Sequence, residues 1–373
     1  MDQTSIFDLL PKEEAKQHKP LPSTDWKWSF KDYPPKNGLK VFSCFACGGG
    51  STMGYKLAGC EVLGCVEIDP KMIRIYRKNH NPKYSYNMDI RDFNKIPDAE
   101  LPQELFDLDI LDGSPPCTTF SMAGDREDTW GKKKKFREGQ KEQTLDDLSF
   151  IFIETAKKLR PKVVIMENVE GLLLGDAFNY VRQIYADFKA SGYKVWHWLC
   201  KGEKMGVPQT RHRTIFVAVR EDLGIDPQGL NMVFNYEPVP YKDIKDGKNR
   251  PMKEDSIYGK AILKAIDQDK SIADTRLRIG EKGSGFQTFY VRPDDVMPTI
   301  RSKNDCIDFY ERAYIGSETI RNASTFPQDY DFQGGPSTIG FVCGMSVPPV
   351  MMKRVVTRLI EQGVFDYKLR AEP

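Results

Sequence analysis

Short apolar runs alternate with stretches of helical spacing between residues 39 and 220. The apolar runs end at Gly, Pro or polar residues, and we predict a strand in each: 39–46, 61–69, 106–113, 162–169, 193–200 and 213–220. The segments between them place apolar residues three or four positions apart, which predicts helices over 51–59, 70–80, 144–161 and 177–192. This alternation predicts an α/β fold with a doubly wound, mostly parallel sheet covered on both faces.

The alternation stops after residue 220. Residues 221–290 are rich in Pro, Gly, Asn and Asp and have weak periodicity, so we predict a separate, small and irregular domain there. Residues 291–373 regain a pattern and end in a helical stretch at 346–363. Residues 1–37 are polar, with prolines and aromatic islands, and we predict a leader that lies on the surface. The remaining part, residues 38–220, is the predicted main domain.

Composition is that of an ordinary soluble globular protein. The 373 residues are 40% hydrophobic and 29% charged, with a net charge of +2. We find no apolar span long enough for a membrane helix and no secretory signal, which predicts a cytoplasmic protein without membrane association. Eight cysteines without regular framework spacing suit free thiols, and with only four histidines we predict no metal site. The lysine-rich stretch 130–141 permits a nucleic-acid partner, although such runs are usually solvated loops.

A glycine turn follows the first predicted strand. The sequence "FACGGG" ends at Gly50, directly before the first predicted helix, and its glycines allow the backbone to approach a ligand closely. Glu67, near the end of the next strand, is placed to bind a ribose, and Asp89 is a candidate partner for an adenine amino group. The spacing is not GxGxxG, so a single nucleoside fits better than a dinucleotide. The alternative is a simple turn with solvated acidic residues.

A second group of residues suggests nucleophilic chemistry. Cys117 stands behind two prolines in "DGSPPCTTFSMAG", a rigid polar loop, whereas we interpret the other seven cysteines as buried filler. Glu167 belongs to the same carboxyl-terminal edge of the sheet and is a candidate proton donor. Arg211 and Arg213 are two positions apart on a predicted strand, so they should share a face and could clamp a phosphate, carbonyl or carboxylate.

The motifs together resemble one enzyme family. "FACGGG", "PPC", "ENV", "QTRHR" and "ETIRNASTFPQDY" followed by "GMSVPP" occur in the order typical of the S-adenosylmethionine-dependent DNA cytosine-C5 methyltransferases, from Leu39 to the C-terminus. The resemblance implies a class I, Rossmann-like methyltransferase fold, with 221–290 as the target-recognition domain. It also implies S-adenosylmethionine as the cosubstrate, double-stranded DNA as the substrate, a monomer, and association with the nucleoid through DNA. A cognate restriction endonuclease is permitted as a functional partner.

The resemblance also implies a mechanism. The Cys117 thiolate would add to C6 of a flipped-out cytosine, which activates C5 toward the methyl group. Glu167 would bind N3 and the exocyclic amine, Arg213 would contact the base near O2, and Arg211 would hold this edge of the site. Segment 121–141 would close on the DNA. The implied cofactor pocket consists of Phe45, Gly49, Gly50, Glu67, Ile68, Asp89, Pro115 and Ser346.

Three positions depart from the family pattern. Cys47 replaces the first glycine of the turn, Ser43 stands where an aspartate is usual, and Met345 replaces an asparagine, which puts the local shape of the cofactor pocket in doubt. Two other functions stay open: a cytosine-C5 methyltransferase acting on RNA or a free nucleotide, and a catalytically silent DNA-binding module. The separate segment 221–290 argues against a nucleotide substrate, and retention of all four catalytic candidates argues against the silent module.

Overall fold

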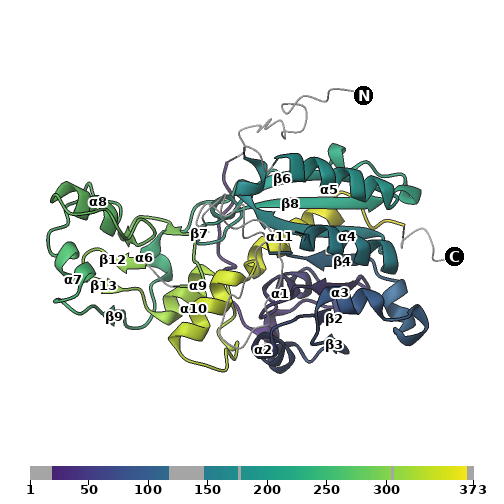
Figure 1. Cartoon of the computed structure of the whole chain (residues 1–373), viewed down its shortest axis with the longest axis horizontal. Coiled ribbons are helices and arrows are strands. Elements are labelled where there is room, and N and C mark those ends of the chain that lie inside the picture. The colour runs from purple at the N-terminus through teal and green to yellow at the C-terminus, as the bar shows by residue number, and fades with distance from the viewer. Residues whose placement is uncertain (1–18, 117–146, 175–177, 304–305, 368–373) are drawn as a thin grey trace.

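The computed structural model describes residues 19–116, 147–174, 178–303 and 306–367. Its larger part contains a seven-stranded sheet with the order β3-β2-β1-β4-β5-β8-β6 (Figure 1). The strands are β1 (Lys40–Cys44), β2 (Glu61–Val66), β3 (Tyr84–Tyr86), β4 (Ile110–Gly113), β5 (Val163–Val169), β6 (Tyr193–Lys201) and β8 (His212–Arg220). Strands β1 to β5 pair in parallel, whereas β8 is antiparallel to both β5 and β6. The predicted mostly parallel sheet is therefore confirmed.

Helices cover both faces of this sheet, as a doubly wound fold requires. One buried cluster joins the sheet to α3 (Ile90–Lys95), α4 (Leu148–Leu159) and α5 (Phe178–Ala190). A second cluster on the other face includes residues of α1 (Gly50–Leu57) and α11 (Pro349–Glu361). The predicted strands and helices of this part are all present; the short β3 and α3 were not predicted.

The smaller part lies beside the large one and has a different construction (Figure 1). Its four-stranded sheet has the order β10-β12-β13-β9. The elements are β9 (Arg250–Pro251), β10 (Phe289–Val291), β12 (Cys306–Asp308) and β13 (Ala313–Tyr314), with the helices α6 (Tyr241–Ile244), α7 (Ile257–Ile262) and α8 (Ile272–Arg278). The predicted boundary at residue 290 falls within β10, and the sheet continues to Tyr314.

The C-terminal segment connects the two parts. Strand β11 (Met297–Pro298) pairs with β7 (Gln209–Thr210), and α9 (Ser317–Ala323) and α10 (Pro336–Met345) precede α11. The stretch Pro336–Glu361 is apolar and long enough to cross a membrane, but 67% of its most apolar window is buried inside the protein. It is also divided between α10 and α11, so we interpret it as two core helices.

The N-terminal segment is not only a surface leader. Trp28 is 6% exposed, and its indole nitrogen donates a hydrogen bond to the carbonyl of Thr325 at 2.8 Å. Asp25 forms ion pairs with Lys353 and Arg354 of α11. The expectation of a surface leader thus fails at Trp28, because this aromatic side chain packs into the core between distant segments.

Candidate active site

The glycine turn between β1 and α1 is held in an unusual backbone conformation. Phe45 and Cys47 have φ angles of 57° and 47°, which are uncommon for residues other than glycine. The backbone N–H of Cys47 donates to Glu67 Oε2 at 2.8 Å. The carbonyl of Gly48 accepts from the Tyr330 hydroxyl at 2.5 Å and from His80 Nε2 at 3.1 Å. Contacts from three other segments therefore fix the turn, as is common for strained backbone at functional sites.

The next two glycines leave no room for a side chain. A Cβ at Gly49, whose φ is +86°, would collide with the His80 ring. A Cβ at Gly50 would collide with the Val347 carbonyl and the Ser346 side chain. The C-terminal segment thus packs directly against the start of α1.

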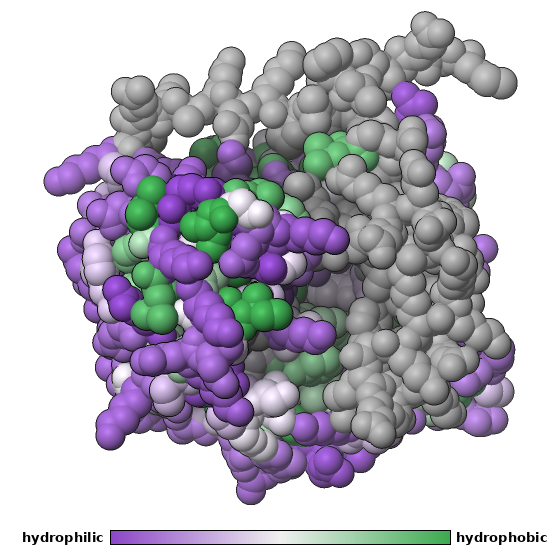
Figure 2. Space-filling model, turned by 60° about the vertical axis from the view of Figure 1, so that its left-hand side comes forward, coloured by the Kyte–Doolittle hydropathy of each residue, from purple (hydrophilic) through white to green (hydrophobic). Residues whose placement is uncertain are grey.

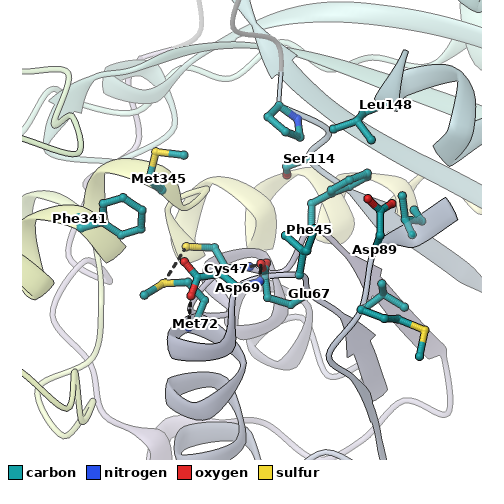
Figure 3. Close-up of a pocket in the computed structure, with 15 residues that line it drawn as sticks. Phe45, Cys47, Glu67, Asp69, Met72, Asp89, Ser114, Leu148, Phe341 and Met345 are labelled. Carbon is teal, nitrogen blue, oxygen red and sulfur yellow. Dashed lines mark hydrogen bonds between the residues drawn. The ribbon is translucent and has the colours of Figure 1, made fainter. Parts of the chain in front are cut away.

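A pocket opens in front of this turn (Figure 3). The space between its lining atoms, counting the open mouth, is about 740 Å³. Phe45 and Asp89 lie on one side of it, and Phe341 and Met345 lie on the other. The charged side chains among its described lining are all acidic: Glu67, Asp69 and Asp89. This lining favours a ligand that carries positive charge and hydrogen-bond donors.

Glu67 is a buried acid of this pocket, with 8% of its surface exposed. Its two oxygens accept backbone N–H groups of Cys47 and Asp69, each at 2.8 Å, so the carboxylate orientation is fixed. Burial raises the pKa of Glu67 to about 7, although these hydrogen bonds oppose the shift. The side chain can therefore gain or lose a proton near neutral pH. Asp89 is more exposed; it caps α3 by accepting the Arg91 N–H at 2.9 Å.

A second group lies along the edge formed by β5 and β8. Glu167 Oε1 and Arg213 Nε form an ion pair at 2.7 Å, and both side chains are largely buried. Arg213 also donates to the His212 carbonyl at 2.6 Å, which fixes the guanidinium. A charged pair held in this way presents a carboxylate and an N–H donor in a defined geometry.

Arg211 does not share the face of Arg213. Its guanidinium donates to the carbonyls of Ile300 at 3.0 Å and Gly344 at 3.2 Å, and burial lowers its pKa to about 9. The chain leaves the regular strand between β7 and β8 at this residue, so the two-residue spacing does not align the arginines. The expectation that both arginines form one clamp is wrong. Arg211 instead joins β8 to the segments that carry Ile300 and Met345.

The loop before Cys117 connects the two groups. Ser114 and Pro116 line the pocket, and the Pro115 carbonyl accepts a hydrogen bond from Asn168 Nδ2 at 3.3 Å. Asn168 is the neighbour of Glu167 on β5. Cys117 itself and the segment 121–141 lie outside the described residues, but the three residues before Cys117 contact the pocket and the neighbour of Glu167 on β5.

Comparison with known proteins identifies the family. A family model described as C-5 cytosine-specific DNA methylase matches residues 39–361. The chain belongs to this family. It is 30% identical over 238 residues to the type II methyltransferase M.FnuDI of Fusobacterium nucleatum, covering 63% of this chain and 60% of that protein. It is 27% identical to M.Sau96I of Staphylococcus aureus over 88% of this chain and 76% of that protein. The aligned chain thus spans less than two thirds of M.FnuDI.

Solved structures share the fold of these C-5 cytosine-specific methylases. The Entamoeba histolytica methyltransferase EhMeth superposes with a TM-score of 0.60 at 13% identity, over 88% of this chain and 99% of that one. A Spodoptera frugiperda DNMT2 mutant gives 0.60 at 15% identity, over 87% and 100% of the two chains. At these identities the likeness supports the class I, Rossmann-like methyltransferase fold alone.

Four of the eight residues expected in the cofactor pocket line the space: Phe45, Glu67, Ile68 and Asp89. The others do not. Gly49 and Gly50 pack behind the turn, Ser346 is buried against Gly50, and Pro115 is turned toward Asn168 while its two neighbours form the wall. The family motifs thus fall on segments that border the space, but the side chains that face the space depend on the local backbone.

Several contributors were not predicted, Asp69 of the pocket lining among them. Asn168 in "ENV" positions the loop before Cys117, and Cys47 lines the pocket, where its thiol contacts Met72 Sδ at 3.6 Å. Burial raises the pKa of Cys47 to about 12, so the thiol stays protonated. Cys44 and Cys47 have C-x-x-C spacing, which the prediction of no metal site overlooked. The described residues contain no group of three metal-binding side chains.

Proposed function

We propose that this protein transfers a methyl group from S-adenosylmethionine to C5 of cytosine in a specific sequence of double-stranded DNA. The observation that carries the proposal is the position of residues 114–116. They contact an acidic pocket on one side and the strand of Glu167 on the other. A nucleophile at Cys117 would therefore stand between the methyl donor and a carboxyl group. Membership in the methylase family supports the same reaction.

The Cys117 thiolate would form a bond to C6 of the cytosine. The displaced electron pair makes C5 nucleophilic, and C5 takes the methyl group as the bond between methyl carbon and sulfonium sulfur breaks. A base then removes the C5 proton, and the thiolate leaves. Glu167 would bind N3 and the exocyclic amine, and its hydrogen bond would favour the protonated ring that accepts the thiolate. Arg213 orients Glu167 and would contact the base near O2.

The target base must leave the DNA helix to reach this site, because C6 is inaccessible within the stack. In the pocket, Glu67 would accept the two ribose hydroxyls and Asp89 the adenine amino group. The acidic lining suits a cosubstrate that carries a sulfonium and an ammonium group. Gly49, Gly50, Pro115 and Ser346 would support the pocket from behind rather than line it, and Arg211 would hold the adjoining segments.

The small part would read the DNA sequence. Segment 221–290, with the strands that extend it to Tyr314, stands apart from the chemistry and would contact base edges in the major groove. The protein would act as a cytoplasmic monomer that reaches the nucleoid through DNA. A cognate restriction endonuclease would be a functional partner and not a physical one. The alternatives, an RNA or nucleotide methyltransferase and a silent module, are separated from it by the test that follows.

The test is covalent trapping. Wild-type protein should form a stable adduct with a duplex that carries 5-fluorocytosine, since the fluorine cannot be removed as a proton. Cys117→Ser should form none and should transfer no methyl group, because a hydroxyl is far less ionised than a thiol. Cys60→Ser, a change at a buried cysteine of the core, serves as the control and should keep both activities. Adduct formation by Cys117→Ser would refute the assignment, and trapping on RNA but not on DNA would favour the RNA enzyme.

A further inference from the structure

A buried carboxylate beneath α1 is unexplained by the proposed chemistry. Asp112, near the end of β4, is 1% exposed. Its oxygens accept hydrogen bonds from the Ser51 hydroxyl at 2.7 Å and the Tyr55 hydroxyl at 3.1 Å. No lysine or arginine among the described residues forms an ion pair with it. Isolated buried charges are costly and are retained where several donors stabilise them.

The two donors lie on one helix. Ser51 and Tyr55 are four positions apart, so they occupy one face of α1, and this face is turned toward β4. Helix α1 begins at Gly50, directly after the turn that carries Cys47 and Gly49. Asp112 therefore fixes the first turn of α1, the helix that directly follows the glycine turn. Burial raises the pKa of Asp112 to about 6, and the nearby charge of Glu167 acts in the same direction, so the side chain is ionised at pH 8.

Ser43 occupies the matching position on the neighbouring strand. In the parallel register of β1 and β4, Ser43 pairs with Asp112. Side chains of paired residues project to the same face of a sheet. Ser43 Oγ lies 3.4 Å from the Thr52 hydroxyl on α1, so it faces the helix as Asp112 does. Position 43 is where the family pattern has an aspartate. A carboxylate from either strand could thus reach the same face of α1.

We propose that Asp112 is a positioning residue for cofactor binding, and that it supplies from β4 the carboxylate that the family pattern has on β1. It acts through Ser51 and Tyr55, which fix α1 and with it the glycine turn. Asp112 does not line the pocket and need not touch the cosubstrate. The inference rests on the proposed function only in naming S-adenosylmethionine as the ligand of that pocket.

The test exchanges the two residues. Asp112→Ser removes the acceptor of both hydroxyls, and Ser43→Asp adds a second carboxylate opposite the first. The double variant contains both changes and keeps the amino-acid composition. Calorimetric titration of S-adenosylmethionine without DNA should show about tenfold weaker binding for each single variant. The double variant should return to within about threefold of the wild type, because one carboxylate again faces α1.

Kinetics separate positioning from general destabilisation. Asp112→Ser should raise KM for the cosubstrate about tenfold and change kcat less than threefold, at a temperature well below its melting midpoint. Asp107→Ser, which removes an exposed carboxylate before β4, should leave both parameters unchanged. Where Asp112→Ser does not fold, Asp112→Asn keeps the side-chain shape and should still weaken binding severalfold, since an amide supplies only one acceptor atom.

Two results would overturn the inference. One is unchanged cosubstrate affinity in a folded Asp112 variant, and the other is a double variant no better than the weaker single one. Failure of the proposed function gives a different result: wild-type protein would bind S-adenosylmethionine and the exchange would behave as expected, but no DNA would be methylated. Wild-type protein that does not bind S-adenosylmethionine would refute both.

Discussion

The two parts of this molecule are held together in different ways. In the large part, β5 and β8 are runs of buried apolar residues that pack between two layers of helices. In the small part, the strands have only two or three residues, and polar side chains connect them. Asp308 of β12 accepts hydrogen bonds from Tyr241 and Lys245 of the α6 region, each at 2.8 Å. The candidate chemistry lies on the part with the larger apolar clusters, and the candidate recognition surface lies on the part with short strands and a smaller apolar cluster.

The surfaces differ as well. Apolar side chains interrupt the hydrophilic surface of the small part (Figure 2). Half of the large apolar residues that are exposed in the described chain lie between positions 257 and 286: Ile257, Leu263, Ile266, Leu277 and Phe286. Exposed apolar groups gathered in one region are typical of interaction sites. The exposed apolar residues of the small part therefore make it a candidate contact surface.

The largest effect is expected on methyl transfer, for a change at Glu167 on β5 of the large part. Glu167→Gln keeps the shape of the side chain but removes its charge and its role as proton donor, and general acid catalysis is worth roughly a hundred- to ten-thousandfold. Methyl transfer to DNA should fall by at least a hundredfold, with cosubstrate affinity within about threefold of the wild type. Glu170→Gln, three residues farther along, is the control and should retain most activity. A fully active Glu167→Gln would move the chemistry away from β5.

The apolar pattern explains which features could be predicted from the sequence. Strands β1, β2, β4, β5 and β8 are buried over most of their length, so their residues appear as continuous apolar runs. Strand β3 was missed because its three residues are only half buried. The short strands of the small sheet were missed because two or three residues are too few to show an alternating pattern, and their pairing joins distant segments. No pattern along the chain records such pairs.

Some residues of the candidate site could be predicted from the sequence, and others could not. Glu67 and Asp89 could be predicted because each follows a strand or helix whose direction the pattern gives. The environment of Arg211 could not, since the chain leaves the strand there and its partners are carbonyls about ninety and one hundred thirty residues away. Asp112 was also missed, because its hydrogen-bond partners Ser51 and Tyr55 are 61 and 57 residues away along the chain.

Stability should separate the two parts. Phe152 of α4 is fully buried against Gly113, and Phe152→Ala should lower the free energy of unfolding by about 3–5 kcal/mol. Ile307→Ala, in the core of the small sheet, should cost about 2–4 kcal/mol but act mainly on that part. Hydrogen exchange should show lost protection throughout the chain for Phe152→Ala and only between about residues 241 and 314 for Ile307→Ala. Global loss in both variants would mean that the parts unfold as one unit.

Proton binding at Glu67 should make cosubstrate affinity depend on pH. The folded-state pKa of about 7 lies above the ordinary carboxyl value, so this group makes the free protein less stable as pH rises from about 4.5 to 7. Cosubstrate affinity should change in the opposite direction, falling as pH drops from 8 to 6, because the ribose hydroxyls need an ionised acceptor. Glu67→Gln should remove this pH dependence and weaken binding at pH 8 about tenfold to a hundredfold, or ~1.5–3 kcal/mol. Calorimetry at several pH values measures both.

The control for this prediction is Glu61→Gln on the same strand, where the side chain is exposed and pairs with Lys36. It should leave the affinity and its pH dependence unchanged. A wild-type affinity that is constant between pH 8 and 6 would mean that Glu67 does not bind the nucleoside.

The smallest effect is expected on the surface of the small part. Phe286 is 63% exposed, and its ring and the Leu277 side chain both approach Gly283. The neighbouring Gln287 accepts a hydrogen bond from Arg301, whose backbone packs against Gly344, next to Met345 of the pocket. Phe286 is therefore next to a residue whose partner contacts the segment before Met345. An exposed aromatic ring in this place can stack on a base or contact a thymine methyl group.

Phe286→Ser should therefore weaken DNA binding about three- to tenfold, or ~0.6–1.4 kcal/mol, without changing cosubstrate affinity. Fluorescence anisotropy with a labelled cognate duplex measures the first quantity, and calorimetry without DNA measures the second. Leu21→Ser changes a similarly exposed apolar residue outside the small part and should have no effect on either. Because stacking is insensitive to sequence whereas methyl contacts are not, an equal loss on cognate and unrelated duplexes indicates stacking, and a loss limited to the cognate duplex indicates recognition. DNA affinity unchanged in Phe286→Ser would leave the exposed apolar residues without a function in DNA binding, and the contrast between the two surfaces would then have to be explained by another partner.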